Sequence, residues 1–166
     1  MKNYNWDQFT KRVTIRATPQ AIYNAWTTQE GIESWFLRLA EFKTEDGVVR
    51  KRNESIARGD KYKWLWFGYD DSFAEESDIR FANGKDELEF GFSGGCIVNV
   101  KMKTEDNEII CELIQTMPMD DEKEQCFFFI ECGKGWTFYL ANMKSILEGG
   151  VDLRNKNVNI QNVINA

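Results

Sequence analysis

The last third of the chain carries apolar residues at helical spacing. Steps of three and four positions connect Trp136, Tyr139, Leu140, Met143, Ile146 and Leu147 before Gly149-Gly150 interrupts the pattern. Counting back from Trp136 in the same steps reaches Phe128, so the helix is expected to begin near Asp121, where acidic residues favour a helix N-terminus. The pattern therefore predicts one long C-terminal helix with a wide apolar face.

Most earlier segments alternate between apolar and polar residues, which is the period-two pattern of a strand with one buried face. The alternating segments span residues 9–17, 37–44, 61–68, 73–82, 86–93, 96–103 and 108–116. Asn83-Gly84 and Glu105–Asn107 are turn sequences between two such segments. Asp46-Gly47 predicts a further hairpin with Val48–Lys51 as its return strand. The sequence thus predicts a meander of antiparallel strands.

Two short helices are expected after the first strand. Thr18-Pro19 supplies an N-cap oxygen and a residue whose fixed φ suits a first helical turn, which opens a helix over Gln20–Thr27. Thr27 and Glu30 then have the spacing of a capping box, so Thr27 is predicted as the N-cap of a second helix. The buried side of this second helix would consist of Ile32, Trp35 and Phe36.

This order of elements predicts an α+β protein in which a curved antiparallel sheet wraps around the long helix. The 166 residues fit one domain with an ordinary hydrophobic core. We assign residues 1–154 to that domain and expect the Asn-rich tail, residues 155–166, to be partly ordered. A sheet that grips a helix leaves room for a ligand between the two, so a binding cavity is expected there.

Composition narrows the class of partner. A net charge of −6 and an isoelectric point near 4.9 disfavour binding to nucleic-acid backbones and to anionic membrane surfaces. The dense basic run Arg50-Lys51-Arg52 is short and typical of a solvated loop. The sequence shows neither the apolar core of a signal peptide nor the roughly 20 apolar residues of a membrane-spanning helix. We therefore expect a cytoplasmic protein that binds no nucleic acid and does not insert into membranes.

The chemistry open to the chain is limited because it contains no histidine. Ser-His-Asp and Cys-His catalysis and the common histidine zinc sites are thereby excluded. The four cysteines fit alternate strand positions and one helix face, so each is interpreted as a small apolar residue. The carboxylate candidates for acid–base catalysis are Glu87, Glu89 and Asp70-Asp71, but the alternation of the two glutamates with apolar residues favours a solvated sheet face. No catalytic residue, metal or cofactor is predicted.

Aromatic residues make up 14% of the chain, and aromatic side chains line apolar pockets as well as filling cores. The faces predicted to point between sheet and helix carry the candidates for the cavity wall, which are Trp35, Trp64, Trp66, Phe90, Phe92, Trp136, Tyr139 and Met143. Ordinary core packing explains such a stripe more often than ligand contact does. If the cavity is real, the Trp N–H groups and the Tyr62 or Tyr139 hydroxyl are its polar anchors, which suits an apolar ligand with one hydroxyl, carbonyl or carboxylate.

Two stretches near the ends of the chain resemble a known family. Residues 17–26, with the sequence ATPQAIYNAW, and the following Ile32 and Trp35-Phe36 are similar to the opening of the C-terminal domain of the activator of heat-shock-protein-90 ATPase. The closing helix of bacterial members of that branch is similar to Gly135-Trp136, Leu140, Met143-Lys144, Leu147–Gly150 and Asp152–Arg154. The resemblance covers about residues 9–154 and implies the START-like helix-grip fold of the SRPBCC superfamily.

The resemblance also implies a cavity between sheet and helix, which relatives use for sterols, lipids, polyketides or plant hormones. It does not imply one chemistry, because fold and function separate easily. In the co-chaperone a further N-terminal domain accompanies this one, whereas about eight residues precede the first strand here, so ATPase activation is not expected.

Three hypotheses follow. The first is a START-like protein that binds a hydrophobic small molecule and has no catalysis of its own. The second is an interaction module that assists a chaperone or another protein, which an exposed apolar patch in place of an enclosed void would favour. The third is a histidine-free cyclase-type enzyme, which needs a buried carboxylate with a raised pKa beside the cavity. The sequence does not indicate the ligand or the oligomeric state.

Overall fold

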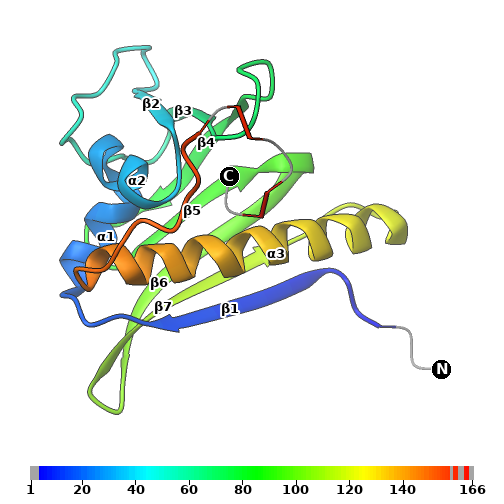
Figure 1. Cartoon of the computed structure of the whole chain (residues 1–166). Helices are drawn as coiled ribbons and strands as arrows, with labels where there is room; N and C mark the ends of the chain where they lie inside the picture. Colours follow the sequence, from blue (N-terminus) through cyan, green and yellow to red (C-terminus); the bar gives the residue numbers. More distant parts are fainter. Residues whose placement is uncertain (1–3, 158, 161–162, 165–166) are drawn as a thin grey trace.

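The computed structural model describes residues 4–157, 159–160 and 163–164, and the predicted architecture is confirmed (Figure 1). The elements are β1 (Gln8–Thr14), α1 (Pro19–Thr27), α2 (Gln29–Trp35), β2 (Leu39–Lys43), β3 (Lys61–Leu65), β4 (Glu75–Ala82), β5 (Glu87–Phe92), the 3₁₀ turn η1 (Ser93–Gly95), β6 (Cys96–Glu105), β7 (Glu108–Thr116) and α3 (Glu122–Leu147). Seven strands form an antiparallel sheet in the order β1-β7-β6-β5-β4-β3-β2. The assignment of residues 1–154 to one domain stays a prediction, and the predicted partial order of the tail falls partly outside the described residues.

The long helix α3 runs across one face of the sheet, alongside β1 (Figure 1). Asp121 is its N-cap, as predicted, and the Asp121 carboxylate accepts a hydrogen bond from the Glu124 amide at 2.8 Å. At the other end Gly149 has φ +80°, and the Gly150 amide donates to the Ser145 carbonyl. This left-handed glycine ends the helix in the usual way.

The two short helices differ from the prediction at one cap. Thr18 caps α1, where its hydroxyl accepts from the Ala21 amide at 3.2 Å. The second helix is capped by Thr28, which accepts from the Gly31 amide at 2.9 Å, so the assignment of Thr27 as N-cap is wrong. Thr27 is still inside α1, and its buried hydroxyl donates to the Tyr23 carbonyl one turn earlier. Thr28 has the extended backbone of an N-cap, with φ −112° and ψ 152°, whereas Thr27 is the last residue of α1, so the cap falls to Thr28.

The predicted hairpins agree with the structure except for one return strand. Gly84 has φ +73° between β4 and β5, and Asp106 and Asn107 have positive φ between β6 and β7, as tight hairpin turns require. Val48–Lys51 is not a strand in the described structure, where it contributes a single bridge between Lys43 and Val49. The valines of this segment are exposed, so no apolar burial holds the segment against β2.

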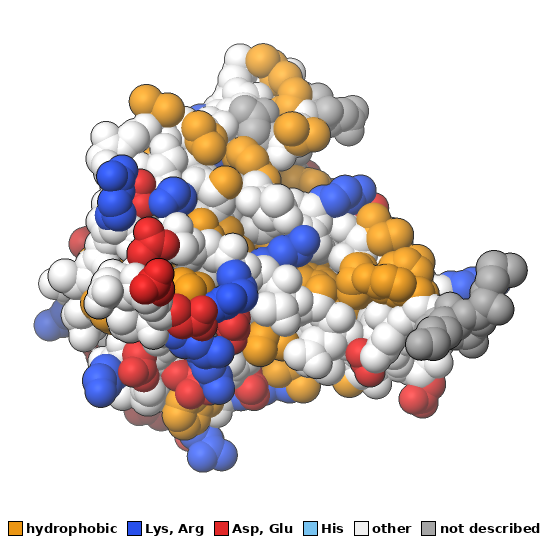
Figure 2. Space-filling model, turned by 90° about the horizontal axis from the view of Figure 1, so that it is seen from below, with side chains coloured by type: hydrophobic (Ala, Val, Ile, Leu, Met, Phe, Trp, Pro, Cys, Tyr) orange, Lys and Arg blue, Asp and Glu red, His pale blue; other side chains and the backbone are white. Residues whose placement is uncertain are grey.

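The core between sheet and helices is built around large aromatic residues. Trp26, Trp35, Trp64 and Trp136 are each at most 2% exposed. The Trp35 indole N–H donates to the Ala25 carbonyl at 2.8 Å, which joins the two short helices. Most charged side chains lie at the surface, and cations and anions are interspersed over one end of the molecule (Figure 2).

The segment after α3 is hydrogen-bonded to the C-terminal end of α2. Arg154 has a side chain only 1% exposed, and its guanidinium donates to the carbonyls of Glu33, Ser34 and Leu37 at 2.7–3.0 Å. It also pairs with Asp152 at 2.7 Å. The sequence leaves open whether these two charges pair or stay solvated, and the structure shows that they pair.

Candidate ligand cleft

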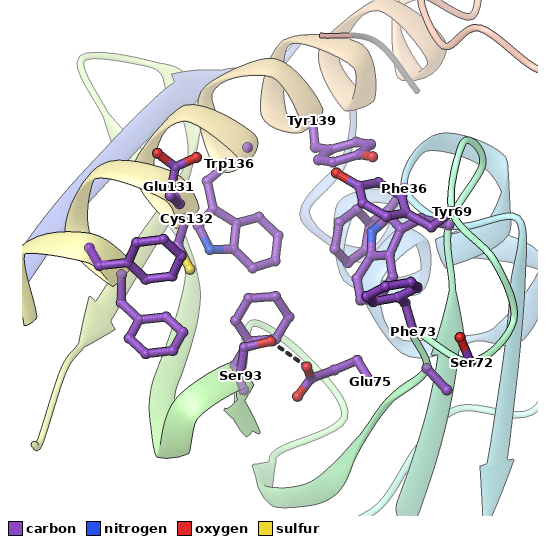
Figure 3. A pocket seen from close by; sticks show the side chains of 16 residues that line it. Phe36, Tyr69, Ser72, Phe73, Glu75, Ser93, Glu131, Cys132, Trp136 and Tyr139 are labelled. Atoms are coloured by element: carbon purple, nitrogen blue, oxygen red, sulfur yellow. Dashed lines mark hydrogen bonds between the residues drawn. The ribbon is translucent and has the colours of Figure 1, made fainter. Parts of the chain in front are cut away.

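A cleft of about 580 Å³ lies between residues 127–139 of α3 and the part of the sheet where β4 begins and β5 ends (Figure 3). Its wall is formed by Phe36, Trp66, Tyr69, Ser72, Phe73, Ala74, Glu75, Phe92, Ser93, Phe127, Phe128, Glu131, Cys132, Gly135, Trp136 and Tyr139. Its volume falls in the range of sites that bury a drug-sized molecule. The elements that contribute are α3, the C-cap of α2, the segment between β3 and β4, the start of β4, the end of β5 and the turn η1.

The eight predicted wall residues divide into two groups. Four of them line the cleft, namely Trp66, Phe92, Trp136 and Tyr139. The other four, namely Trp35, Trp64, Phe90 and Met143, are at most 1% exposed and lie in the core outside the lining. Ligand contact by the first group stays a prediction.

The contrast between Trp64 and Trp66 has a simple cause. Trp64 is inside β3, where its ring stacks on Tyr62 at a centroid distance of 3.9 Å. β3 ends at Leu65, so Trp66 already belongs to the segment that leaves the sheet and enters the wall of the cleft. The alternation along the chain gives both residues the same face, but the end of the strand separates their environments.

The apolar wall consists of rings that hold one another in place. Phe36 meets the Tyr139 ring edge-on at 4.8 Å and the Trp66 ring edge-on at 5.7 Å. Trp136 lies 5.1 Å from Phe36 and 5.3 Å from Phe92. Because each ring packs against others, the wall offers flat apolar surfaces that are already in place before a ligand arrives.

Part of the lining has no clear signal in the sequence. Tyr69 and Phe73 come from the segment between β3 and β4; Tyr69 lies outside every alternating segment, and Phe73 begins the predicted strand 73–82 but precedes β4, which starts at Glu75. Phe128 is positioned by Gly94, because a Cβ at this glycine would overlap the Phe128 ring. The Gly94-Gly95 pair indicates only a break between strands when the sequence is considered alone.

The polar part of the cleft is centred on Glu75. This partly buried carboxylate accepts a hydrogen bond from the Ser93 hydroxyl, and both residues lie across the open space from Trp136 and Tyr139 (Figure 3). Burial raises the pKa of Glu75, and the hydrogen bond from Ser93 opposes that shift only in part. Within the described structure no Lys or Arg lies within ion-pair distance of Glu75.

Among the other lining groups, Glu131 is ion-paired, and the Tyr139 hydroxyl and the Cys132 thiol are protonated at neutral pH. Glu131 is exposed at the rim and pairs with Lys134 at 2.6 Å. Burial raises the pKa of the Tyr139 hydroxyl, and the neighbouring Tyr69 adds to the shift. Burial likewise raises the pKa of the Cys132 thiol, so it stays protonated at neutral pH and is a weak nucleophile.

The carboxylates considered from the sequence lie outside the lining. Glu87 pairs with Lys101 at 3.0 Å and accepts from the Asn99 amide at 3.1 Å. Asp71 pairs with Arg38, and Asp70 accepts from the Ser72 amide. Among the described residues, no group of three His, Cys, Asp or Glu side chains could hold a metal ion, and no helix is long and apolar enough to cross a membrane.

Comparison with known proteins identifies the fold but not the family. No protein-family model and no curated protein matches the sequence. The Aha1 dimer from Colwellia psychrerythraea is similar with a TM-score of 0.63 and 17% identity over 86% of this chain and 97% of that one. A crystal structure of a Staphylococcus saprophyticus protein has a TM-score of 0.68 and 14% identity over 89% and 96%.

A third similar structure is CalU16 from Micromonospora echinospora, with a TM-score of 0.61 and 15% identity over 87% of this chain and 76% of that one. Identities this low show a shared fold and carry no site or partner from one chain to another. The chain therefore has the START-like helix-grip fold, and an Aha1 structure is among those that share it.

Proposed function

We propose that this protein binds a hydrophobic small molecule in the cleft between α3 and the sheet and catalyses no reaction of its own. The supporting observation is the cleft itself, about 580 Å³ in volume and walled mainly by aromatic rings. Helix-grip proteins commonly bind hydrophobic ligands, which agrees with this use of the space. The ring-on-ring packing of Phe36 against Trp136 and Tyr139 lowers the entropic cost of ordering the wall around a ligand.

Gly135 offers a way to close the cleft without damaging the fold. It lies inside α3, lines the cleft, and a Cβ at this position would meet no described heavy atom within 4 Å. Replacing a mid-helix glycine with almost any other residue favours the helix, by about 1 kcal/mol for alanine. Gly135→Phe therefore places a ring in the open space, whereas Gly135→Ala changes helix propensity and leaves most of the space open.

The test is mass spectrometry of the purified protein under native and then denaturing conditions. We expect a discrete added mass on the wild-type chain and on G135A that is lost on denaturation, and no added mass on G135F. Equal added mass on G135F and G135A would place the ligand elsewhere. If the wild-type chain carried no added mass and bound no apolar probe, the proposal would be wrong.

A second candidate function is an interaction module for a chaperone or another protein. It is favoured by the exposed aromatic rim of the cleft, where Tyr69, Phe73 and Phe127 are 59–66% exposed. A further apolar cluster is formed by Tyr4, Trp6 and Phe129, whose rings pack together at centroid distances of 4.2–5.6 Å. The double variant Phe73→Ser with Phe127→Ser should then abolish binding to a purified heat-shock-protein-90-type ATPase, while the exposed control Val151→Ser should not.

The third candidate, a cyclase-type enzyme, depends on Glu75. This residue meets the expected condition in part, because it lies beside the cleft and has a raised pKa but is only partly buried. The supporting feature is limited to one carboxylate and its Ser93 donor. Turnover of a linear polyketide by the wild-type protein and its loss in Glu75→Gln would support this function over simple binding.

A further inference from the structure

The cleft wall contains one carboxylate, that of Glu75, that has no ion-pair partner in the described structure. The lining holds two carboxylates, Glu75 and Glu131, and contains no Lys or Arg among its described residues. Glu131 is compensated by Lys134 at the rim. The Arg38 guanidinium, which donates to the carbonyl of the lining residue Trp66, is paired with Asp71. Glu75 is thus the one lining charge that has no ion pair in the described structure.

Glu75 is also short of hydrogen-bond donors. A carboxylate accepts about four hydrogen bonds, and here a single donor, the Ser93 hydroxyl, is bonded to one of the Glu75 oxygens. The raised pKa of Glu75 reports the same shortage, since burial disfavours the charged form when compensation is incomplete. A group that brings positive charge and several donors to this point would relieve both deficits.

The opposite wall favours the same kind of group. Trp136 and Tyr139 face Glu75 across the open space, with Phe36 beside them (Figure 3). The faces of aromatic rings attract cations, most strongly for tryptophan, and the attraction grows as the site is withdrawn from water. A cation between Glu75 and these rings would therefore be favoured from both sides, whereas an anion would be disfavoured from both.

We propose that the cleft selects an amphiphilic cation, in which an aromatic or aliphatic body lies among the rings and a protonated amine pairs with the Glu75 carboxylate. This inference rests on the proposed function and names its ligand class. It replaces the sequence-based expectation of a ligand with a hydroxyl, carbonyl or carboxylate, because no signal in the sequence places Glu75 in the wall. An ammonium group supplies three donors and one positive charge, which match the unfilled positions around Glu75.

The experiment compares three probes that share one body. Phenylhexylamine, phenylhexanol and phenylhexanoate carry a cation, a neutral hydroxyl and an anion at neutral pH, and their binding to the full chain is measured by calorimetry. We expect the amine to bind at least about tenfold more tightly than the carboxylate, because the amine gains a charge-assisted hydrogen bond to Glu75 where the carboxylate meets a like charge. The alcohol should fall between them.

The matched control removes the general effect of an acidic protein. Glu75→Gln and Glu89→Gln each reduce the net negative charge by one, but Glu89 lies on β5 outside the lining. We expect E75Q to bring the amine and carboxylate affinities within about threefold of each other, and E89Q to retain the wild-type preference. Ser93→Ala keeps the Glu75 charge, so it should retain the preference as well.

The outcomes separate this inference from the proposed function. If the probes bind to wild-type protein and are excluded by G135F, but the amine has no advantage, ligand binding stands and cation selection is overturned. The same holds if E75Q and E89Q lose the preference equally, because the effect is then one of net charge. If none of the three probes binds to wild-type protein or to E75Q, the proposed function itself fails.

Discussion

The indole N–H of Trp136 donates a hydrogen bond to the side-chain oxygen of Gln115 at 2.7 Å, across the buried contact between α3 and β7. Trp136 is 2% exposed and Gln115 is fully buried. The Gln115 amide nitrogen in turn lies 3.8 Å from the Met117 sulfur. This buried hydrogen bond therefore links the long helix to β7 and favours the helix rotation in which Gly135 and Tyr139 line the cleft.

Removing the Trp136 side chain should cost a large part of the stability. We expect Trp136→Ala to lower the free energy of unfolding by about 3–5 kcal/mol, because it leaves a cavity where the helix meets the sheet. Chemical denaturation of the two proteins gives this difference. A loss below about 1 kcal/mol would contradict the anchoring role of this residue.

The polar half of the same contact can be tested separately. Trp136→Phe keeps an aromatic ring but leaves Gln115 without its indole donor, and an unsatisfied buried polar group costs about 1–3 kcal/mol. The double variant Trp136→Phe with Gln115→Leu removes both partners and should recover part of that loss. If the two changes were additive, the Trp136 and Gln115 side chains would contribute independently, and the hydrogen bond would add nothing to stability.

Breaking the Arg154 contacts should loosen the end of α2. Arg154→Met leaves Asp152 without its buried partner and three carbonyls without their donor, and disruption of a buried pair costs about 3–5 kcal/mol. Lys156→Met removes the same unit of charge and also loses a contact with Asp152, but Lys156 is 54% exposed, so the cost should stay below about 1 kcal/mol. Equal denaturation midpoints for the two variants would contradict the fastening role of Arg154.

The fold is largely predictable from the sequence because its signals are local. The period-two segments, the Asn83-Gly84 turn, the Thr18-Pro19 helix start and the Asp121 cap each depend on a few neighbouring residues. The one wrong cap shows the limit of such rules. Thr27 and Thr28 are both suitable residue types, and the choice depends on where α1 ends, because Thr27 is still helical whereas Thr28 has the extended backbone of an N-cap.

The cleft is less predictable because it depends on where elements end and which distant residues meet. Trp64 and Trp66 have the same phase, yet the end of β3 places one in the core and the other in the wall. Glu75 and Ser93 are 18 positions apart and meet only through the pairing of β4 with β5. Both residues lie in period-two segments, but no motif marks either of them as part of a cleft before the sheet is assembled.

The ionisation of Glu75 should make stability depend on pH. An unfolded glutamate has a pKa of about 4.3, and burial raises the Glu75 pKa in the folded protein. The folded state therefore binds more protons above about pH 4.3, so stability falls as pH rises through the Glu75 titration. We expect Glu75→Gln to be more stable than wild type at pH 7, with the difference disappearing near pH 4.

Asp152 should show the opposite sign. Burial opposes its ionisation, but hydrogen bonds from Arg154 and Lys156 lower the pKa of Asp152 below its usual range. Its contribution is present above the unfolded pKa of about 3.9 and is lost as pH falls below that value. Denaturation midpoints of wild type, E75Q and Asp152→Asn between pH 3 and 8 measure both effects. A difference between wild type and E75Q that is constant with pH would mean that the Glu75 pKa is unchanged by folding.

Gly94 connects backbone geometry to the shape of the cleft. It has φ +68°, and a Cβ there would overlap the Phe128 ring, so alanine brings both strain and a clash. Gly47 has φ +86°, and a Cβ there would meet no described heavy atom within 4 Å, so alanine brings strain alone, about 1–2 kcal/mol. We expect Gly94→Ala to cost at least about 1 kcal/mol more than Gly47→Ala in chemical denaturation, because the Phe128 ring must move. Since Phe128 lines the cleft, G94A should also weaken binding of the apolar probes, whereas G47A should leave their binding unchanged. Equal binding by the two variants would mean that the position of Phe128 does not define the site.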